Sequence, residues 1–118
     1  MKFENRNIGK LGEGLAENYL VNKGYEIIMC NYSTRFGEID LICLDKEVTV
    51  FVEVKAKKTL AFGTPEEMFT RGKYNKVKRM ATVYLKGKDT SCRIDMVAVE
   101  LGNDNSVRSL RHYENVVF

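Results

Sequence analysis

The chain has 118 residues, of which 44% are hydrophobic and 30% are charged, and its formal net charge is +3. This length fits one domain, 1–118, with enough apolar residues for a core, so disordered, collagen-like and repeat architectures are excluded. No apolar run approaches the roughly 20 residues of a membrane-spanning helix. No signal-peptide core follows the N-terminus either, so we expect a cytoplasmic protein without a membrane partner.

The first half of the chain predicts one helix and three strands. Asn7 is suited to cap a helix that runs to about Lys23, and Gly24 then fits the left-handed position that ends a helix. Strands are expected at residues 25–31, 38–44 and 48–57, separated by turns at 33–37 and 45–47.

The second half predicts a helix between two further strands. Pro65 suits the first turn of a helix that extends to about Lys86, where Gly87 ends it. A strand at 91–101 and an edge strand at 107–114 complete the order α-β-β-β-α-β-(β). This order predicts a mixed sheet with helices packed on it, an α/β or α+β layered domain.

The charge distribution is uneven. Residues 55–88 hold ten basic and two acidic residues, a net charge of +8, whereas the remainder of the chain is at −5. A basic segment on a nearly neutral protein is typical of a polyanion binder. A solvated helix face is the alternative interpretation.

The cysteines and the histidine do not resemble a zinc site. Cys30, Cys43 and Cys92 are widely spaced, and His112 is the one histidine. Because zinc needs thiols and imidazoles in closer groups, the sequence predicts buried free thiols. His112 is expected to be a surface or partly buried residue.

Charged residues interrupt two apolar strands. Glu53 and Lys55 share one face of their strand, about 7 Å apart along it. Burial of such charges is costly unless they are paired or bind a metal. The preceding strand carries Glu38 and Asp40, and antiparallel pairing across the short turn would bring Asp40 beside Glu53. Two such carboxylates suit Mg²⁺, and a neighbouring lysine can orient water or stabilise a phosphate. A cross-strand ion pair is the alternative.

The motifs GEID (37–40) and FVEVK (51–55) resemble the core of the PD-(D/E)XK nucleases. The chain is more closely similar to the small bacterial YraN-type proteins, an uncharacterised family of predicted endonucleases. Their remaining motifs are matched by Gly9, Gly12-Glu13, Ala16, Tyr19-Leu20, Lys73, Tyr84-Leu85 and Arg93-Ile94-Asp95. The resemblance covers residues 7–118.

This resemblance implies a restriction-endonuclease-like α/β fold and Mg²⁺- or Mn²⁺-dependent cleavage of phosphodiester bonds in DNA, with branched or damaged DNA as candidate substrates. It assigns Asp40, Glu53, Lys55 and Glu13 to catalysis, the three acids also binding the metal. On a helical wheel, Glu13 lies at the margin of the apolar stripe, whereas Glu17 points away from it. Resolvase-like relatives imply a homodimer. Glu38 is either a second acid or a turn residue.

The basic segment would then contact phosphates. The residues expected to do so are Lys57, Lys58, Lys73, Lys76 and Lys78. Two features depart from the nuclease pattern: Ile39 stands where the nominal motif has proline, and the chain contains no glutamine. Asp95 is expected to pair with a basic residue or to border the site. A non-catalytic nucleic-acid-binding module on a nuclease fold remains the alternative function.

Overall fold

The computed structural model describes residues 2–58 and 60–118. Two helices, a 3₁₀ turn and five strands follow the predicted order, and the edge strand is present. The elements are α1 (Lys2–Lys23), β1 (Glu26–Thr34), β2 (Gly37–Asp45), β3 (Val48–Lys57), η1 (Glu66–Met68), α2 (Arg71–Leu85), β4 (Cys92–Leu101) and β5 (Val107–Tyr113).

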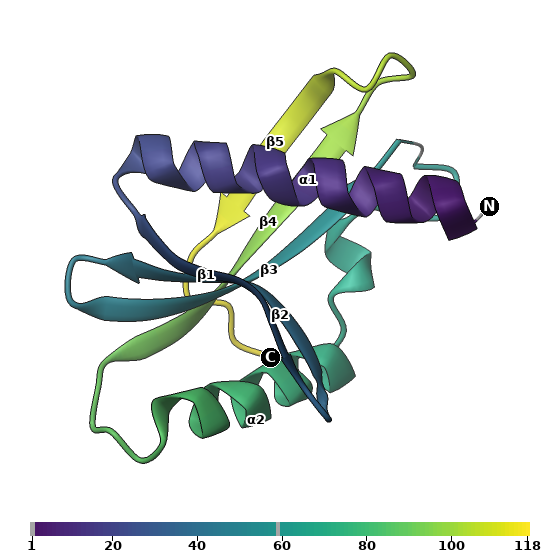
Figure 1. Cartoon of the computed structure of the whole chain (residues 1–118). Helices are drawn as coiled ribbons and strands as arrows, with labels where there is room; N and C mark the ends of the chain where they lie inside the picture. The colour runs from purple at the N-terminus through teal and green to yellow at the C-terminus, as the bar shows by residue number, and fades with distance from the viewer. Residues whose placement is uncertain (1, 59) are drawn as a thin grey trace.

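The five strands form one mixed sheet in the order β1-β2-β3-β4-β5 (Figure 1). Neighbouring strands are antiparallel except β3 and β4, which are parallel. A parallel pair needs a crossover connection, and the segment that contains α2 supplies it. The expected α/β fold, a mixed sheet with helices packed on it, is confirmed.

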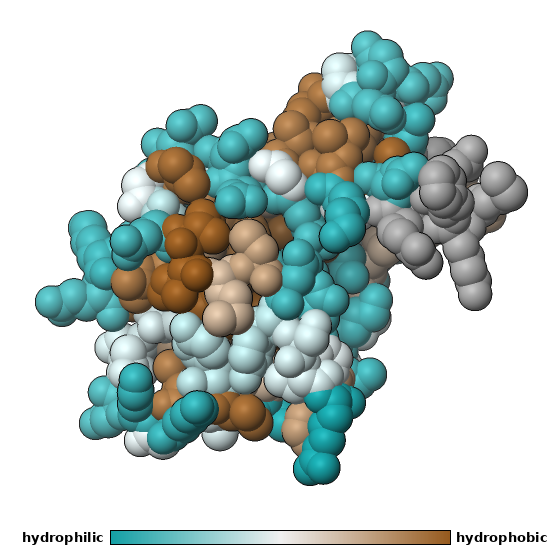
Figure 2. Space-filling view, in the orientation of Figure 1, coloured by the Kyte–Doolittle hydropathy of each residue, from teal (hydrophilic) through white to brown (hydrophobic). Residues whose placement is uncertain are grey.

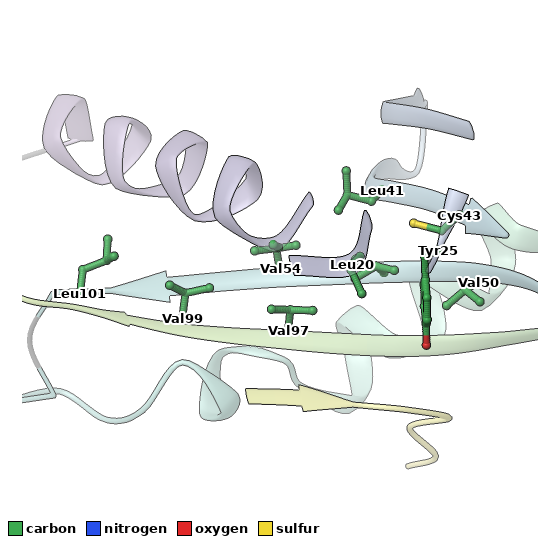
Figure 3. Packing of buried hydrophobic residues seen from close by; sticks show 11 residues of the cluster. Leu20, Tyr25, Leu41, Cys43, Val50, Val54, Val97, Val99 and Leu101 are labelled. Atoms are coloured by element: carbon green, nitrogen blue, oxygen red, sulfur yellow. The ribbon is translucent and has the colours of Figure 1, made fainter. Parts of the chain in front are cut away.

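The two helices cover opposite faces of the sheet. Alternate residues of β3 divide between the faces: Val50, Val52 and Val54 pack under α1, whereas Phe51 packs under α2. Figure 3 shows the core on the α1 side, where Leu20 lies among the valines of β3 and β4. Because both faces are buried, the central strands are almost continuously apolar.

Two glycines fix the position of α1. A Cβ added at Gly12 would lie 2.5 Å from Cβ of Ala56, so this glycine lets the helix rest directly on β3. Gly24, with φ +105°, ends the helix, and Tyr25 N donates to Leu20 O at 2.9 Å. This is the hydrogen bond of a Schellman motif, and it turns the chain back into β1.

Both predicted helix starts were wrong. Helix α1 begins at Lys2, and Asn7 lies within it rather than capping it, because residues 2–6 contain no glycine or proline to stop the helix. Helix α2 begins at Arg71, where the Thr70 side chain accepts a hydrogen bond from Lys73 N. Pro65 instead precedes η1, and extended Phe69 separates the two helical segments.

Other differences are local. β1 reaches Thr34, so the predicted turn shrinks to Arg35 and Phe36. The three cysteines are free, as expected, but only Cys43 is buried, while Cys30 and Cys92 are exposed. No described helix is both long and apolar enough to cross a membrane.

Candidate active site

The candidate site lies where β2 and β3 part. Their backbone pairing runs from Asp45–Val48 to Leu41–Val52 and ends there, although both strands continue. The first residues of β2 stay paired with β1. The side chain of Asp40 bridges the opening, because its Oδ2 accepts a hydrogen bond from Val54 N at 2.7 Å.

Asn31 marks the point at which the β1–β2 hairpin bends away from β3. It lies between the pairs Cys30–Leu41 and Tyr32–Ile39 and has φ 54°, a left-handed conformation that asparagine tolerates better than most residues. The alternation of β2 also breaks here: Ile39 packs on the α2 side, while Leu41 packs on the α1 side. The bend opens the fork between β2 and β3.

Asp40 and Glu53 meet in this fork, as the sequence predicts. Glu53 is buried, with 8% of its surface exposed. Burial raises the pKa of Asp40 well above its ordinary value, and the hydrogen bond and the charge of Glu53 raise it further. Two carboxylates at such close range repel each other when both are charged.

Two lysines face the carboxylate pair. Lys55 lies two residues after Glu53 on β3, and its charge opposes the rise in the pKa of Asp40. Lys73 comes from α2, and the charge of Lys55 together with burial lowers the pKa of Lys73. Acidic and basic groups from three elements therefore converge on one point.

These side chains line a cavity of about 320 Å³. Its wall is formed by Glu13, Phe36, Gly37, Glu38, Asp40, Glu53, Lys55, Lys73, Lys76, Val77 and Met80. Helix α1 contributes Glu13, not Glu17, as the helical wheel indicates. The α2 side supplies the apolar floor, where Met80 lies within 4 Å of a Cβ built on Gly37.

Glu13 lies near Asp40 but has a different hydrogen-bond partner. Asn31 donates from Nδ2 to Glu13 Oε1 at 3.0 Å and also to Glu38 Oε1. Burial raises the pKa of Glu13, the hydrogen bond from Asn31 opposes this, and the charges of Asp40 and Glu38 add to it. Asn31 thus holds two acids from different elements at the cavity wall.

The donor set suits a divalent ion that keeps most of its water. Among residues 2–58 and 60–118, no three His, Cys, Asp or Glu side chains form a ready-made metal cluster. The fork offers the Asp40–Glu53 pair, with Glu13 and Glu38 farther along the wall. Mg²⁺ is commonly held by one or two carboxylates plus water and substrate phosphate. The residues therefore fit Mg²⁺ or Mn²⁺, and the role of Glu13 as a ligand stays a prediction.

The five lysines expected to contact phosphate are not grouped together. Lys73 and Lys76 line the cavity. Lys57 donates to the carbonyl oxygens of Phe62 and Gly63, and so holds the loop after β3.

The other two lysines border separate hollows. Lys58 borders one beside Glu100 and Arg108, and Lys78, whose ammonium lies over the ring of Tyr74, borders another. Their predicted contacts with phosphate would therefore lie outside this cavity.

Sequence patterns did not reveal two groups at the site. The first is Asn31, whose signal is an asparagine inside an otherwise apolar strand. The second is a cluster of Arg35, Phe36 and Arg79, in which both guanidinium groups lie over one ring. Arg35 and Arg79 are far apart in sequence, so periodicity gives no sign that they meet.

Asp95 and His112 belong to a separate network on the α1 face. Asp95 is fully buried and accepts hydrogen bonds from His112 Nε2 at 2.8 Å, Arg93 Nε at 3.0 Å and Asn115 N at 3.0 Å. Burial opposes ionisation, yet these hydrogen bonds hold the pKa of Asp95 below its ordinary value. The expected basic partner is confirmed as Arg93.

His112 is partly buried, one of the two positions that the sequence predicts. The exposed part is backbone, since its side chain is only 2% exposed. The ring fills the space between Tyr19 and Tyr25, with centroid distances of 5.7 and 5.6 Å. This packing places His112 in the network of Asp95 rather than at the candidate site.

Comparison with known proteins identifies close relatives whose activity is not described. The model of "Uncharacterised protein family UPF0102" matches residues 12–99. A UPF0102 protein of Alkaliphilus oremlandii is 44% identical over 82% of this chain and 87% of its own length. Similar proteins of Desulfosudis oleivorans and Clostridium botulinum are 41% and 36% identical, over 95% and 98% of this chain and 93% and 97% of their own.

Proposed function

The chain belongs to the UPF0102 family, and we propose that it is a metal-dependent endonuclease that hydrolyses phosphodiester bonds in DNA. One observation carries the proposal. The carboxylates of Asp40 and Glu53 meet in an opening of the sheet, with the ammonium groups of Lys55 and Lys73 beside them. A structural ion pair would need one acid and one base, whereas this site gathers two of each around a cavity, and one of them, Glu53, is buried.

Asp40 and Glu53 would hold Mg²⁺ or Mn²⁺. When bound, such an ion would neutralise charge that develops on the phosphodiester and activate water for attack. A divalent cation held by both carboxylates would offset the repulsion between them. Asp40 is held in place by the hydrogen bond from Val54 N, so one ligand is oriented before the ion arrives.

Lys55 and Lys73 act on the substrate side. Lys55 lies close enough to Asp40 to affect its pKa, so its ammonium can hold the attacking water or a phosphate oxygen. Lys73 and Lys76 reach the same cavity from α2 and supply positive charge for the phosphate. Water attacks phosphorus, the bond to one sugar oxygen breaks, and that oxygen takes up a proton.

Metal binding gives the first test. Millimolar Mn²⁺ should raise the melting temperature of the wild-type chain, because an ion at 100 times its Kd stabilises by about 2.7 kcal/mol. Asp40→Asn and Glu53→Gln should lose the shift. Glu47→Gln, an exposed carboxylate in the β2–β3 turn, serves as the matched control and should retain it. No shift for the wild type would refute the metal site.

Cleavage gives the second test. A panel of single-stranded, duplex, flap and four-way-junction DNA with Mn²⁺ identifies the substrate. Lys55→Ala should reduce cleavage by about 10²-fold or more while DNA binding persists. DNA binding without metal binding or cleavage would favour the alternative, a binding module on a nuclease fold. Cleavage by Asp40→Asn at the wild-type rate would refute the assignment of that residue.

A further inference from the structure

Two arginines from distant parts of the chain meet on one aromatic ring at the rim of the candidate site. The Cζ atoms of Arg35, in the β1–β2 turn, and Arg79, in α2, lie 5.0 and 5.3 Å from the centroid of Phe36. Both distances are within the range of cation–π attraction. Figure 2 shows strongly hydrophilic side chains where this hairpin meets α2, at the lower right of the view.

The hairpin tip is held firmly in place. Phe36 N donates to Thr34 Oγ1 at 3.0 Å, which closes the turn. Gly37 has φ +140°, and a Cβ built on it would lie 3.7 Å from Cε of Met80, so the hairpin rests on α2 at ordinary contact distance. Arg35 and Arg79 are therefore brought together by the fold and do not merely share a flexible surface.

These guanidinium groups differ from those of two other arginines, Arg93 and Arg111. Arg93 is neutralised by Asp45, Asp95 and Glu114, and Arg111 by Glu66 and Glu100. In the described parts of the chain, no carboxylate lies within ion-pairing distance of Arg35 or Arg79. Two cationic groups gathered at one ring without an acid leave a local excess of positive charge, which a bound anion would reduce.

We propose that Arg35 and Arg79, gathered on Phe36, form a clamp for a nucleic-acid backbone phosphate. This phosphate would lie next to the phosphate at the Asp40–Glu53 pair. The inference rests on the proposed function and deepens it. Guanidinium groups bind phosphate through paired hydrogen bonds. Phe36 itself lines the cavity with Lys73 and Lys76, so the clamp and the carboxylate fork are parts of one surface. Phosphate contacts position a strand without reading its sequence.

The clamp predicts a specific change in salt dependence. Binding is measured by fluorescence anisotropy, with a labelled oligothymidylate and a duplex as probes, in EDTA so that cleavage does not interfere. Arg35→Gln and Arg79→Gln should each weaken binding about tenfold, and each should reduce the slope of log affinity against log salt by about 0.7 to 0.9. In the double variant, the two losses of affinity and the two reductions in slope should add together.

A matched control separates the clamp from bulk charge. Arg108→Gln removes the same charge from an exposed arginine in β5, beside a different hollow, and should leave affinity and slope unchanged. Phe36→Leu keeps apolar bulk but removes the aromatic face, and should weaken binding less than the double variant. Unchanged melting temperatures show that the variants are folded.

The outcomes distinguish the clamp from the nuclease itself. Wild-type binding that the double variant retains in full, with the same salt slope, overturns the clamp and leaves the proposed function standing. An equal loss in Arg108→Gln also overturns the clamp, because the effect is then one of net charge. No binding of either probe by the wild type also overturns the clamp, and the metal-binding and cleavage tests then decide the proposed nuclease separately.

Discussion

Replacement of Gly12 by alanine should destabilise the protein, although alanine is the better helix former. The new Cβ would lie 2.5 Å from Cβ of Ala56, whereas carbon atoms in contact prefer about 3.5–4.0 Å. A Cβ cannot rotate away, so α1 would have to rise from β3 by about 1 Å. Overpacking by two Cβ atoms that cannot rotate falls in the upper part of the usual range, about 2–3 kcal/mol, and the helix propensity of alanine returns about 1 kcal/mol. We expect a net loss of about 1–2 kcal/mol.

Gly14→Ala is the matched control in the same helix. Nothing lies within 4 Å of a Cβ at Gly14, which is exposed, so the same substitution should stabilise the protein by about 0.5–1 kcal/mol. The two variants are thus predicted to move stability in opposite directions. Urea unfolding followed by circular dichroism measures both, and an unchanged m-value shows that the denatured state is not affected.

A second substitution tests the cause. Ala56→Gly removes the other Cβ, and alone it should cost about 0.5–1 kcal/mol, because glycine weakens a strand. In the double variant with Gly12→Ala, the free energy of unfolding should be about 1–2 kcal/mol higher than the sum of the two single effects predicts. This difference lies within the range of coupling energies between residues in contact. If Gly12→Ala is as stable as the wild type, or if Ala56→Gly gives no rescue, the close approach of α1 to β3 is not the constraint.

Two further predictions concern ion pairs. Asp95→Asn keeps the shape of a fully buried side chain but removes the charged acceptor of His112 and one of the three acids that pair with Arg93, so it should cost about 1–3 kcal/mol by urea unfolding. Exposed Asp89→Asn should change stability by less than about 0.5 kcal/mol, and a similarly small loss for Asp95→Asn would contradict the buried network. Hydrogen bonds from Arg111 lower the pKa of Glu66 from 4.5 to about 2. A lowered pKa stabilises the folded state above pH 4.5, and this contribution is lost as the pH falls towards 2. Melting temperatures across that interval should therefore fall less steeply for Glu66→Gln, and parallel curves would count against the pairing.

Strand patterns in the sequence predicted much of the candidate site. The alternation of β3 places Glu53 and Lys55 on one face, and the short turn before Val48 makes β2 its antiparallel neighbour, so Asp40 was expected beside Glu53. These inferences depend only on the period of two along a strand and on the reach of a tight turn. Both properties are local, which is why residue types and spacing were sufficient.

The helix starts were harder to predict because several signals compete. Pro65 is a good first residue for a helix, but the extended backbone at Phe69 interrupts the segment, and Thr70 supplies the cap that is used. A proline or an asparagine shows where a helix is able to begin. Which candidate is used depends on the packing of the residues that follow it.

Sequence by itself determined the order of the elements, the two faces of the sheet and the pairing of the acids. The tertiary structure decided where β2 leaves β3, that Asn31 bends the hairpin, and that Arg35 and Arg79 meet on Phe36. It also decided that Lys57 holds a loop. The physical reason is that periodicity records which face of its own element a side chain occupies, whereas contacts between residues distant in sequence depend on how the elements pack.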